Sequence, residues 1–187
     1  MKALLFLLTA ALLLAARPAA TTYQLLPAAS RLTWTGHAEL GSYAPSGTLQ
    51  LAAGELRYNG RRLLAGRVLV DMRSLRHDNA QLQEHLRGPE FFDVGQFPTA
   101  EFRLQQATSG QVRGRLTVKG VAQTVTFPLT LSPGPDGTLR LRGTASLDRT
   151  RFGIRYNSTS FFTDLGDRAI RNDFQLSFDL LARSTAD

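Results

Sequence analysis

The feature of this sequence that most restricts its fold is a strict alternation of apolar and polar residues. Residues 174–180 read FQLSFDL, and residues 139–147 read LRLRGTASL. Segments 112–118 and 125–131 repeat the pattern, with mainly Val, Leu and Phe on one side and mainly Arg or Thr on the other. Successive side chains of a strand point to opposite faces, so each segment predicts a half-buried antiparallel strand.

Weaker versions of the same alternation indicate further strands. They lie near residues 31–38, 46–51, 55–58, 64–72 and 101–106. Glycine-containing turn signals separate the strands, at Ala53-Gly54, Asn59-Gly60, Ser109-Gly110 and residues 133–137 (PGPDG). No linker or repeat divides the chain after its first 20 residues, so we expect one domain over residues 21–187.

One short helix is predicted at residues 79–87. Asp78 or Asn79 can cap its N-terminus. Leu82 and Leu86 lie four residues apart and share one face. Gly88 can close the helix in the left-handed conformation, and the proline after it prevents continuation.

Many short strands and one helix predict an all-β fold, an antiparallel barrel of about eight strands. Such a barrel encloses just enough room for side chains or one small ligand. The alternative is an outer-membrane barrel, whose apolar face points outward. Most predicted segments are shorter than the ~9–11 residues of a membrane-spanning strand. Tyr and Trp total five, too few for two aromatic girdles, so we expect the apolar face to point inward.

The first 20 residues have the layout of a secretory signal peptide. A basic Lys2 precedes the apolar run at residues 3–16, and small residues follow at Ala19 and Ala20. The run is shorter than the ~20 residues that cross a bilayer as a helix; an uncleaved membrane anchor is the alternative. We therefore expect residues 1–20 to be a signal peptide and the protein to be periplasmic or secreted.

The basic charge is spread along the chain rather than clustered. Removal of residues 1–20 takes away two basic residues and no acid, which lowers the net charge from +7 to +5. The arginines are best interpreted as solvated strand faces, with attraction to acidic lipid head groups as the alternative. We expect no nucleic-acid partner. Peripheral contact with a membrane and homodimer formation are left open by the sequence.

No set of residues with catalytic or metal-binding spacing is present. His77 and His85 are eight residues apart, whereas helical zinc motifs use three or four. There is no Gly-x-Ser-x-Gly nucleophile elbow and no glycine-rich phosphate loop. Residues 148–153 (DRTRFG) predict a structural bend with local ion pairing. We expect that the protein is not an enzyme and uses no metal or cofactor.

Phenylalanine is abundant and partly paired. The chain has 11 Phe, with adjacent pairs at residues 91–92 and 161–162. Aromatic side chains at a barrel mouth can hold an acyl or prenyl chain. The alternative is that they fill the barrel ends as ordinary core.

Five short motifs occur in a fixed order: SRLTWTG (30–36), GRVLVDMRSL (66–75), HLRGPEFFDVGQFPTAEF (85–102), LTVKGVAQTVTFPL (116–129) and LDRTRFGI (147–154). In this order they resemble the YceI-like family of periplasmic lipid-binding proteins, over residues 23–181. The match is weakest over residues 41–60, which leaves the length of a pocket open.

The resemblance implies a lipocalin-like barrel that carries a polyisoprenoid or similar amphiphilic lipid, such as an isoprenoid quinone. It places Phe91, Phe92, Phe97, Phe102 and Phe127 near the helix and the barrel wall. We add Trp34, Phe152, Phe161 and Phe162 as further candidate ligand contacts. The alternative function is that of an envelope stress or interaction protein with a filled barrel and no ligand.

Overall fold

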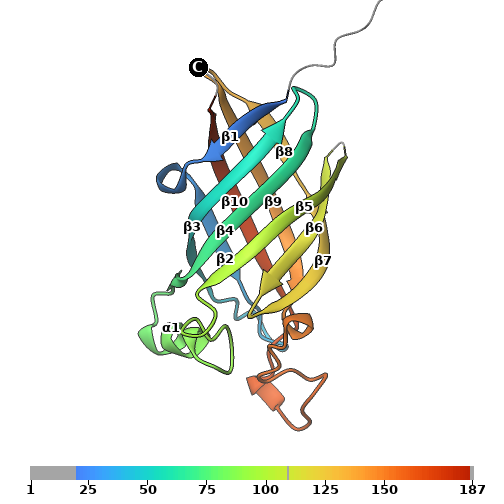
Figure 1. Ribbon diagram of the computed structural model, residues 1–187. Helices are drawn as coiled ribbons and strands as arrows, with labels where there is room; N and C mark the ends of the chain where they lie inside the picture. The colour runs from blue at the N-terminus through green and yellow to red at the C-terminus, as the bar shows by residue number, and fades with distance from the viewer. Residues whose placement is uncertain (1–19, 109, 186–187) are drawn as a thin grey trace, which may run out of the picture.

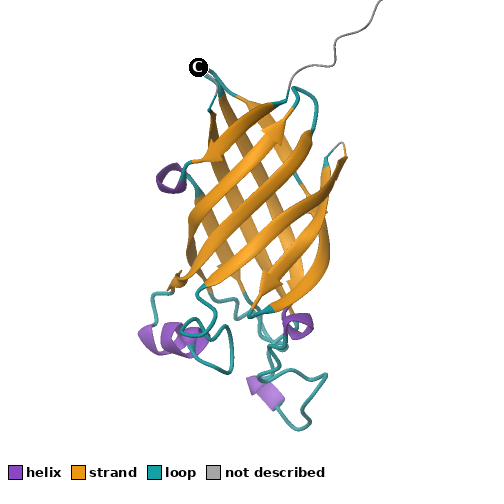
Figure 2. Ribbon diagram, in the orientation of Figure 1, coloured by secondary structure: helices purple, strands orange, loops and turns teal. Residues whose placement is uncertain are grey.

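Ten strands form one antiparallel sheet that curves into a barrel (Figures 1 and 2). The structure, a computed structural model, describes residues 20–108 and 110–185, so the predicted signal peptide lies outside the described residues except for its last position. The strands are β1 (Thr21–Leu25), β2 (Arg31–Thr35), β3 (Ser46–Tyr58), β4 (Leu63–Arg76), β5 (Thr99–Thr108), β6 (Gln111–Val118), β7 (Val121–Pro128), β8 (Thr130–Pro133), β9 (Thr138–Asp148) and β10 (Asp173–Ser184). The helices are α1 (Ala80–Arg87) and the 3-10 turns η1 (Pro27–Ala29), η2 (Arg149–Phe152) and η3 (Gly166–Arg168).

The ten strands fill eight positions around the barrel, because two positions are each divided in two. β1 and β2 both lie between β3 and β10, and η1 separates them. β7 pairs with β6, and its continuation β8 pairs with β9 after a break at Leu129. A proline stands at each interruption, Pro27 and Pro128, and cannot donate a backbone hydrogen bond. The predicted barrel of about eight strands is therefore confirmed.

The apolar face of the sheet points inward, as predicted. On β10, Leu180 and Ala182 are buried, and on β9 so are Leu139 and Leu141. The outward positions of β9 include Arg140 and other polar residues that are exposed. This is the reverse of the pattern in a transmembrane barrel. Strand length, by contrast, does not distinguish this barrel from a transmembrane barrel, because β3 and β4 have 13 and 14 residues.

Two local predictions were wrong. Ala53-Gly54 is not a turn, because β3 continues through it and a register shift between Leu51 and Ala53 absorbs the irregularity. Gly88 is not left-handed: its φ and ψ are −71° and 174°. Pro89 forces the residue before it into an extended conformation, and this is what ends α1. Of the two predicted N-cap residues, Asn79 is the cap, since its side chain accepts a hydrogen bond from Leu82 N at 3.0 Å.

The two ends of the barrel differ. One end is closed by buried side chains, among them Leu25, Tyr58, Leu139 and Ala182, of which the last two are 0% exposed. The other end, which we call the mouth end, carries α1, the loop at residues 36–45 and the loop at 153–172 (Figure 1). This asymmetry makes the mouth end the place to look for a site.

An arginine pair holds an aspartate on the outer face. Asp179 of β10 accepts hydrogen bonds from Arg140 at 2.6 and 2.7 Å and from Arg142 at 3.1 Å, both on β9. The hydrogen bond from Arg140, and then that from Arg142, lowers the pKa of the Asp179 carboxyl from 3.8 to about 2.

Asp179→Asn is expected to lower the free energy of unfolding at pH 7 by less than about 1 kcal/mol, because the pair is partly exposed. A carboxyl with a depressed pKa adds stability above its unfolded pKa, near 3.8, and the contribution is lost as pH falls through the folded value, about 2. Urea titrations between pH 7 and pH 2 should show the difference from wild type shrinking below about pH 4. Asp78→Asn is the control, and a difference that does not change with pH would contradict the assignment.

Candidate functional site

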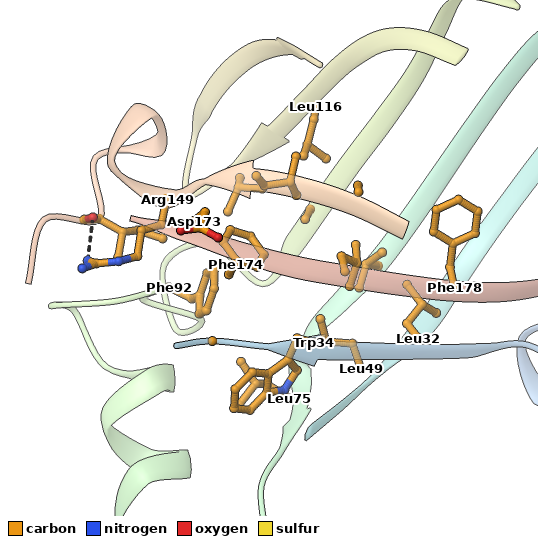
Figure 3. A pocket seen from close by; sticks show the side chains of 18 of the residues that line it. Leu32, Trp34, Leu49, Leu75, Phe92, Leu116, Arg149, Asp173, Phe174 and Phe178 are labelled. Atoms are coloured by element: carbon orange, nitrogen blue, oxygen red, sulfur yellow. Dashed lines mark hydrogen bonds between the residues drawn. The ribbon is translucent and has the colours of Figure 1, made fainter. Parts of the chain in front are cut away.

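An apolar cavity of about 410 Å³ occupies the barrel and opens at the mouth end (Figure 3). Ligand-binding pockets in proteins have volumes of roughly 300–1,000 Å³. Every strand from β2 to β10 except β8 contributes to the wall, and the lining is almost entirely aliphatic and aromatic. The cavity can therefore hold a small apolar group and exclude water from it. Representative wall residues are Leu32, Leu49, Val68, Val70, Met72, Leu104, Leu116, Val118, Leu141, Ala145, Leu176 and Phe178.

Three phenylalanine rings line the wall in a row. The ring centroids of Phe102 and Phe127 lie 5.3 Å apart, and those of Phe127 and Phe178 lie 5.7 Å apart. Each outer ring covers a glycine of the neighbouring strand: a Cβ added at Gly114 would overlap the Phe102 ring, and one at Gly143 would overlap Phe178. Rings that lie over glycines stay close to the wall, and this leaves the centre of the barrel open.

A second aromatic group lies beneath α1 near the mouth. Trp34 of β2 and Phe91, from the loop after α1, are buried in one cluster with Leu75, Leu86 and Ile154. Phe92 packs against this cluster and against the main core, and its ring lies 6.4 Å from that of Phe174. The cluster fixes α1 to the barrel and forms one side of the cavity mouth.

The Trp34 indole has an unpaired nitrogen. Its Nε1 is the one buried side-chain nitrogen or oxygen without a hydrogen-bond partner among residues 20–108 and 110–185. The indole ring is 5.8 Å from the imidazole of His77.

The opposite side of the mouth is built on a buried arginine. Arg149 is 4% exposed and donates hydrogen bonds to four backbone carbonyls, those of Ile154, Tyr156, Ile170 and Arg171, at 2.8–3.1 Å. Burial lowers the pKa of this guanidinium, and nearby Asp148 partly offsets the effect. Arg149 thereby ties the beginning and the end of the 153–172 loop together beside the cavity (Figure 3).

Charged groups in the lining gather at the mouth. Asp167, Arg168, Arg171 and Asp173 all line the cavity there, and Arg171 forms an ion pair with Asp173 at 2.9 Å. Apart from His37 and Glu101, the acidic and basic lining residues come from positions 149–173. The cavity is thus apolar in its depth and polar at its entrance, a shape that suits an amphiphile with its tail inside.

Five of the nine predicted contact residues line this cavity, and their contact with a ligand stays a prediction: Trp34, Phe91, Phe92, Phe102 and Phe127. The structure brings Phe102 and Phe127 together, and Phe91 and Phe92 lie at the mouth.

The other four predicted residues lie elsewhere. The Phe97 ring packs beside Gly120 at the β6–β7 turn. Phe152 is buried in the core next to β7 and β9. Phe161 and Phe162 are 45% and 50% exposed on the 153–172 loop.

Sequence reasoning missed Phe174 and Phe178 as wall residues. The alternation over residues 174–180 places both on the inward face with Leu176, so the signal was present in the sequence. It also missed the role of Arg149. Residues 148–153 do form a bend, but the arginine binds backbone carbonyls instead of an acidic side chain, and Asp148 caps η2 by accepting from Thr150 N at 2.9 Å.

The histidines do not assemble a metal site. Within the described ranges, no group of three or more His, Cys, Asp or Glu residues is placed to hold a metal ion. His85 pairs with Glu90 at 3.0 Å, and the Nδ1 atom of His77 accepts a hydrogen bond from Asn79 N. In the same part of the chain, no helix is long and apolar enough to cross a membrane.

Comparison with known proteins gives a consistent result. The profile of the YceI-like domain matches residues 23–182. A UPF0312 protein of Vibrio vulnificus is 30% identical over 138 residues, which cover 67% of this chain and 73% of that protein.

Two solved structures have the same fold. The crystal structure of Burkholderia cenocepacia BcnA superposes with a TM-score of 0.69 at 19% identity, over 84% of this chain and 98% of BcnA. A polyisoprenoid-binding domain from Saccharophagus degradans, implicated in plant cell wall breakdown, gives a TM-score of 0.67 at 10% identity, over 88% and 99% of the two chains.

Gly114→Ala is expected to destabilise the protein by about 1–3 kcal/mol, because the new methyl group would overlap the Phe102 ring and the Arg103 carbonyl. Gly95→Ala is the matched control, since a Cβ there meets no atom within 4 Å. Urea unfolding of both variants measures the difference. Equal stabilities would show that the wall at Gly114 can move aside.

Arg149→Lys is expected to cost about 2–4 kcal/mol of unfolding free energy, because one ammonium group cannot satisfy four separated carbonyls. Arg151→Lys, on the exposed side of the same turn, should change stability by less than about 0.5 kcal/mol. Thermal and urea unfolding compare the two. A loss that is the same in both would contradict a special role for Arg149.

Proposed function

The chain belongs to the YceI-like family, and on that premise we propose that it is a binding protein that holds a polyisoprenoid or similar amphiphilic lipid in its barrel. The tail occupies the apolar cavity and the head group stays among the charged residues of the mouth. The observation that carries the proposal is the cavity itself: it is closed at one end and almost entirely apolar along its length, and its charged lining residues other than Glu101 lie near its opening. An isoprenoid quinone is one ligand with this distribution of polarity.

Burial of the lipid tail alone gives enough binding free energy, so no specific polar contact is required. Burial of one methylene group stabilises a complex by about 0.8 kcal/mol, so ten carbons contribute roughly 8 kcal/mol. That corresponds to a dissociation constant of about 1 μM before the cost of ordering the chain is subtracted. An isoprenoid tail gains binding free energy for each unit that the cavity encloses, because each enclosed unit buries apolar surface.

The Saccharophagus degradans domain is described as polyisoprenoid-binding, and this supports the same ligand class for this chain. The layout of residues 1–20 supports export to the periplasm, where a lipid would otherwise have to cross water between membranes. The mechanism we propose is sequestration, in which no bond of the lipid is made or broken. We propose no cofactor and no metal.

The second candidate is an envelope stress or interaction protein whose barrel is filled and binds no ligand. It requires side chains to occupy the interior. The 410 Å³ cavity favours the lipid carrier over this alternative, because the three wall phenylalanines leave the centre open.

Native mass spectrometry of the gently purified protein tests the proposal. We expect a mass excess of several hundred daltons that organic solvent releases, and the extracted compound identifies the tail. The same spectrum gives the mass of the polypeptide and thus the signal cleavage site. A protein that is free of ligand, and remains so after incubation with prenyl quinones and prenyl alcohols, would favour the filled-barrel alternative.

Ala145→Phe is expected to reduce bound lipid at least tenfold while the protein stays folded, because Ala145 is an inward-facing residue that lines the cavity and a ring fills part of it. Thr144→Phe is the matched control: it adds the same ring to the adjacent, outward-facing position. Lipid per protein is measured by extraction and mass spectrometry. Equal loss of lipid in the two variants, or no loss in either, would contradict the proposed location.

A further inference from the structure

Exposed apolar side chains are concentrated at the mouth end. Six large apolar residues are strongly exposed in the part of the chain that the structure describes. Four of them lie on the two mouth loops: Leu40 and Tyr43, each 63% exposed, on residues 36–45, and Phe161 and Phe162 on residues 153–172. Leaving four large apolar groups in water is costly, so a group of them at one end of a molecule indicates a contact surface.

The two loops are joined to each other. Ala38 and Ile170 form an isolated antiparallel bridge. Glu39 N donates to Ala169 O at 2.8 Å, and Arg171 N donates to His37 O at 3.0 Å. Arg149 donates hydrogen bonds to backbone carbonyls near both ends of the longer loop. We call residues 36–45 and 153–172 together the mouth rim, and these bonds make it one ordered unit.

The mouth rim is continuous with the cavity. Tyr43, itself strongly exposed, also lines the cavity, as do Arg168 and Ala169 of the longer loop. In Figure 1 the longer loop, drawn in orange, projects beyond the end of the barrel on the side where the cavity opens. Whatever the rim touches is therefore placed directly at the cavity entrance.

The chemistry of the rim suits the boundary between head groups and acyl chains. The Arg155 guanidinium lies 4.7 Å above the centre of the Phe161 ring, so its charge sits beside an exposed aromatic face. Tyrosine and arginine side chains, which have an apolar body and a polar tip, are typical of membrane interfaces, and phenylalanine and leucine form the apolar face of segments that bind there. The rim contains three arginines and three acidic residues (Glu39, Asp164, Asp167), so its formal charge is zero and acidic head groups do not repel it. The +5 charge of residues 21–187 attracts an acidic surface from a distance.

We propose that the mouth rim docks on the surface of a lipid bilayer, with Leu40, Tyr43, Phe161 and Phe162 inserted at the boundary between head groups and acyl chains. This inference rests on the proposed function and adds the route of loading. Each methylene moved into water is disfavoured about fourfold, so passage of ten carbons through water is disfavoured on the order of a millionfold. A rim seated on the bilayer lets the tail pass from membrane to cavity without that exposure.

A bilayer fits the rim better than a second copy of the chain does. A stable dimer needs a matching face of about 800 Å² on each partner. A bilayer interface demands no such shape, so it accepts a projecting loop with two adjacent aromatic rings. A dimer formed through the rims would also seal both cavities away from any membrane.

The test is binding to vesicles of phosphatidylethanolamine and phosphatidylglycerol, measured by co-sedimentation. Removal of residues 1–20 is confirmed by mass first, because the apolar run at residues 3–16 would bind vesicles by itself. We expect the double variant Phe161→Ser, Phe162→Ser to bind at least tenfold less tightly than wild type, since two half-exposed rings lose their insertion. Leu64→Ser, a comparably exposed residue (43%) at the closed end, should bind within twofold of wild type.

Lipid loading from detergent micelles is measured in parallel, because it reports on the cavity alone. Wild type that loads lipid from detergent but does not bind vesicles would overturn the docking proposal and leave the carrier function standing. Vesicle binding that depends on the two phenylalanines, without any lipid loading, would support docking and contradict the carrier function. Equal vesicle binding by wild type, the double variant and Leu64→Ser would contradict the mouth rim as the docking site. A wild-type dimer that the double variant converts to monomer, with no vesicle binding, would assign the rim to a second copy instead.

Discussion

The hollow interior depends on how aromatic rings are placed on the barrel wall. Eight strand positions enclose little more space than their inward side chains need, so a ring that points toward the axis would fill it. Phe102 and Phe178 instead lie over Gly114 and Gly143, and Phe127 stands between them. Because glycine has no side chain, the ring takes the space at the wall and the axis stays open. The capacity of the cavity follows from these contacts between neighbouring strands.

The second requirement is that the barrel be closed at one end and open at the other. The closed end is ordinary hydrophobic core, with Leu139 and Ala182 fully buried. The open end has no hydrophobic core of its own, so other contacts must hold its loops in place. On one side Trp34, Leu75 and Leu86 anchor α1. On the other, the Arg149 guanidinium provides hydrogen bonds to carbonyls that would otherwise lie unpaired at the barrel end. The buried guanidinium and its neutral carbonyl partners thus hold this side of the open end in place, as a small hydrophobic core would.

These features connect stability with ligand binding. Apolar wall atoms that face an open cavity lack the contacts that a packed core would give them. A lipid tail supplies those contacts, and a ligand that binds only the folded state stabilises it by mass action. The mouth rim continues this apolar surface outside the barrel. Its apolar side chains also lack packing partners: Leu40, Tyr43, Phe161 and Phe162 are exposed to solvent. On the proposed function, cavity and rim serve one lipid, first in the bilayer and then in the barrel.

The sequence by itself determined the antiparallel barrel, its inward apolar face and the position of α1, and it narrowed the N-cap to Asp78 or Asn79. Each of these depends on periodicity or on residues close together in the chain, which are readable without a structure. Its resemblance to the YceI-like family also pointed to Phe102 and Phe127. Only the tertiary structure decided which aromatics share the cavity: Phe97, Phe152, Phe161 and Phe162 belong to similar sequence patterns but lie outside it. The same holds for Arg149, whose four carbonyl partners lie up to 22 residues away. Whether a ring fills the barrel or lies along its wall depends on which residue of the next strand it covers. Gly143 is directly opposite Phe178, and Gly114 is two residues from the position opposite Phe102. These neighbours are fixed by strand register and not by sequence distance.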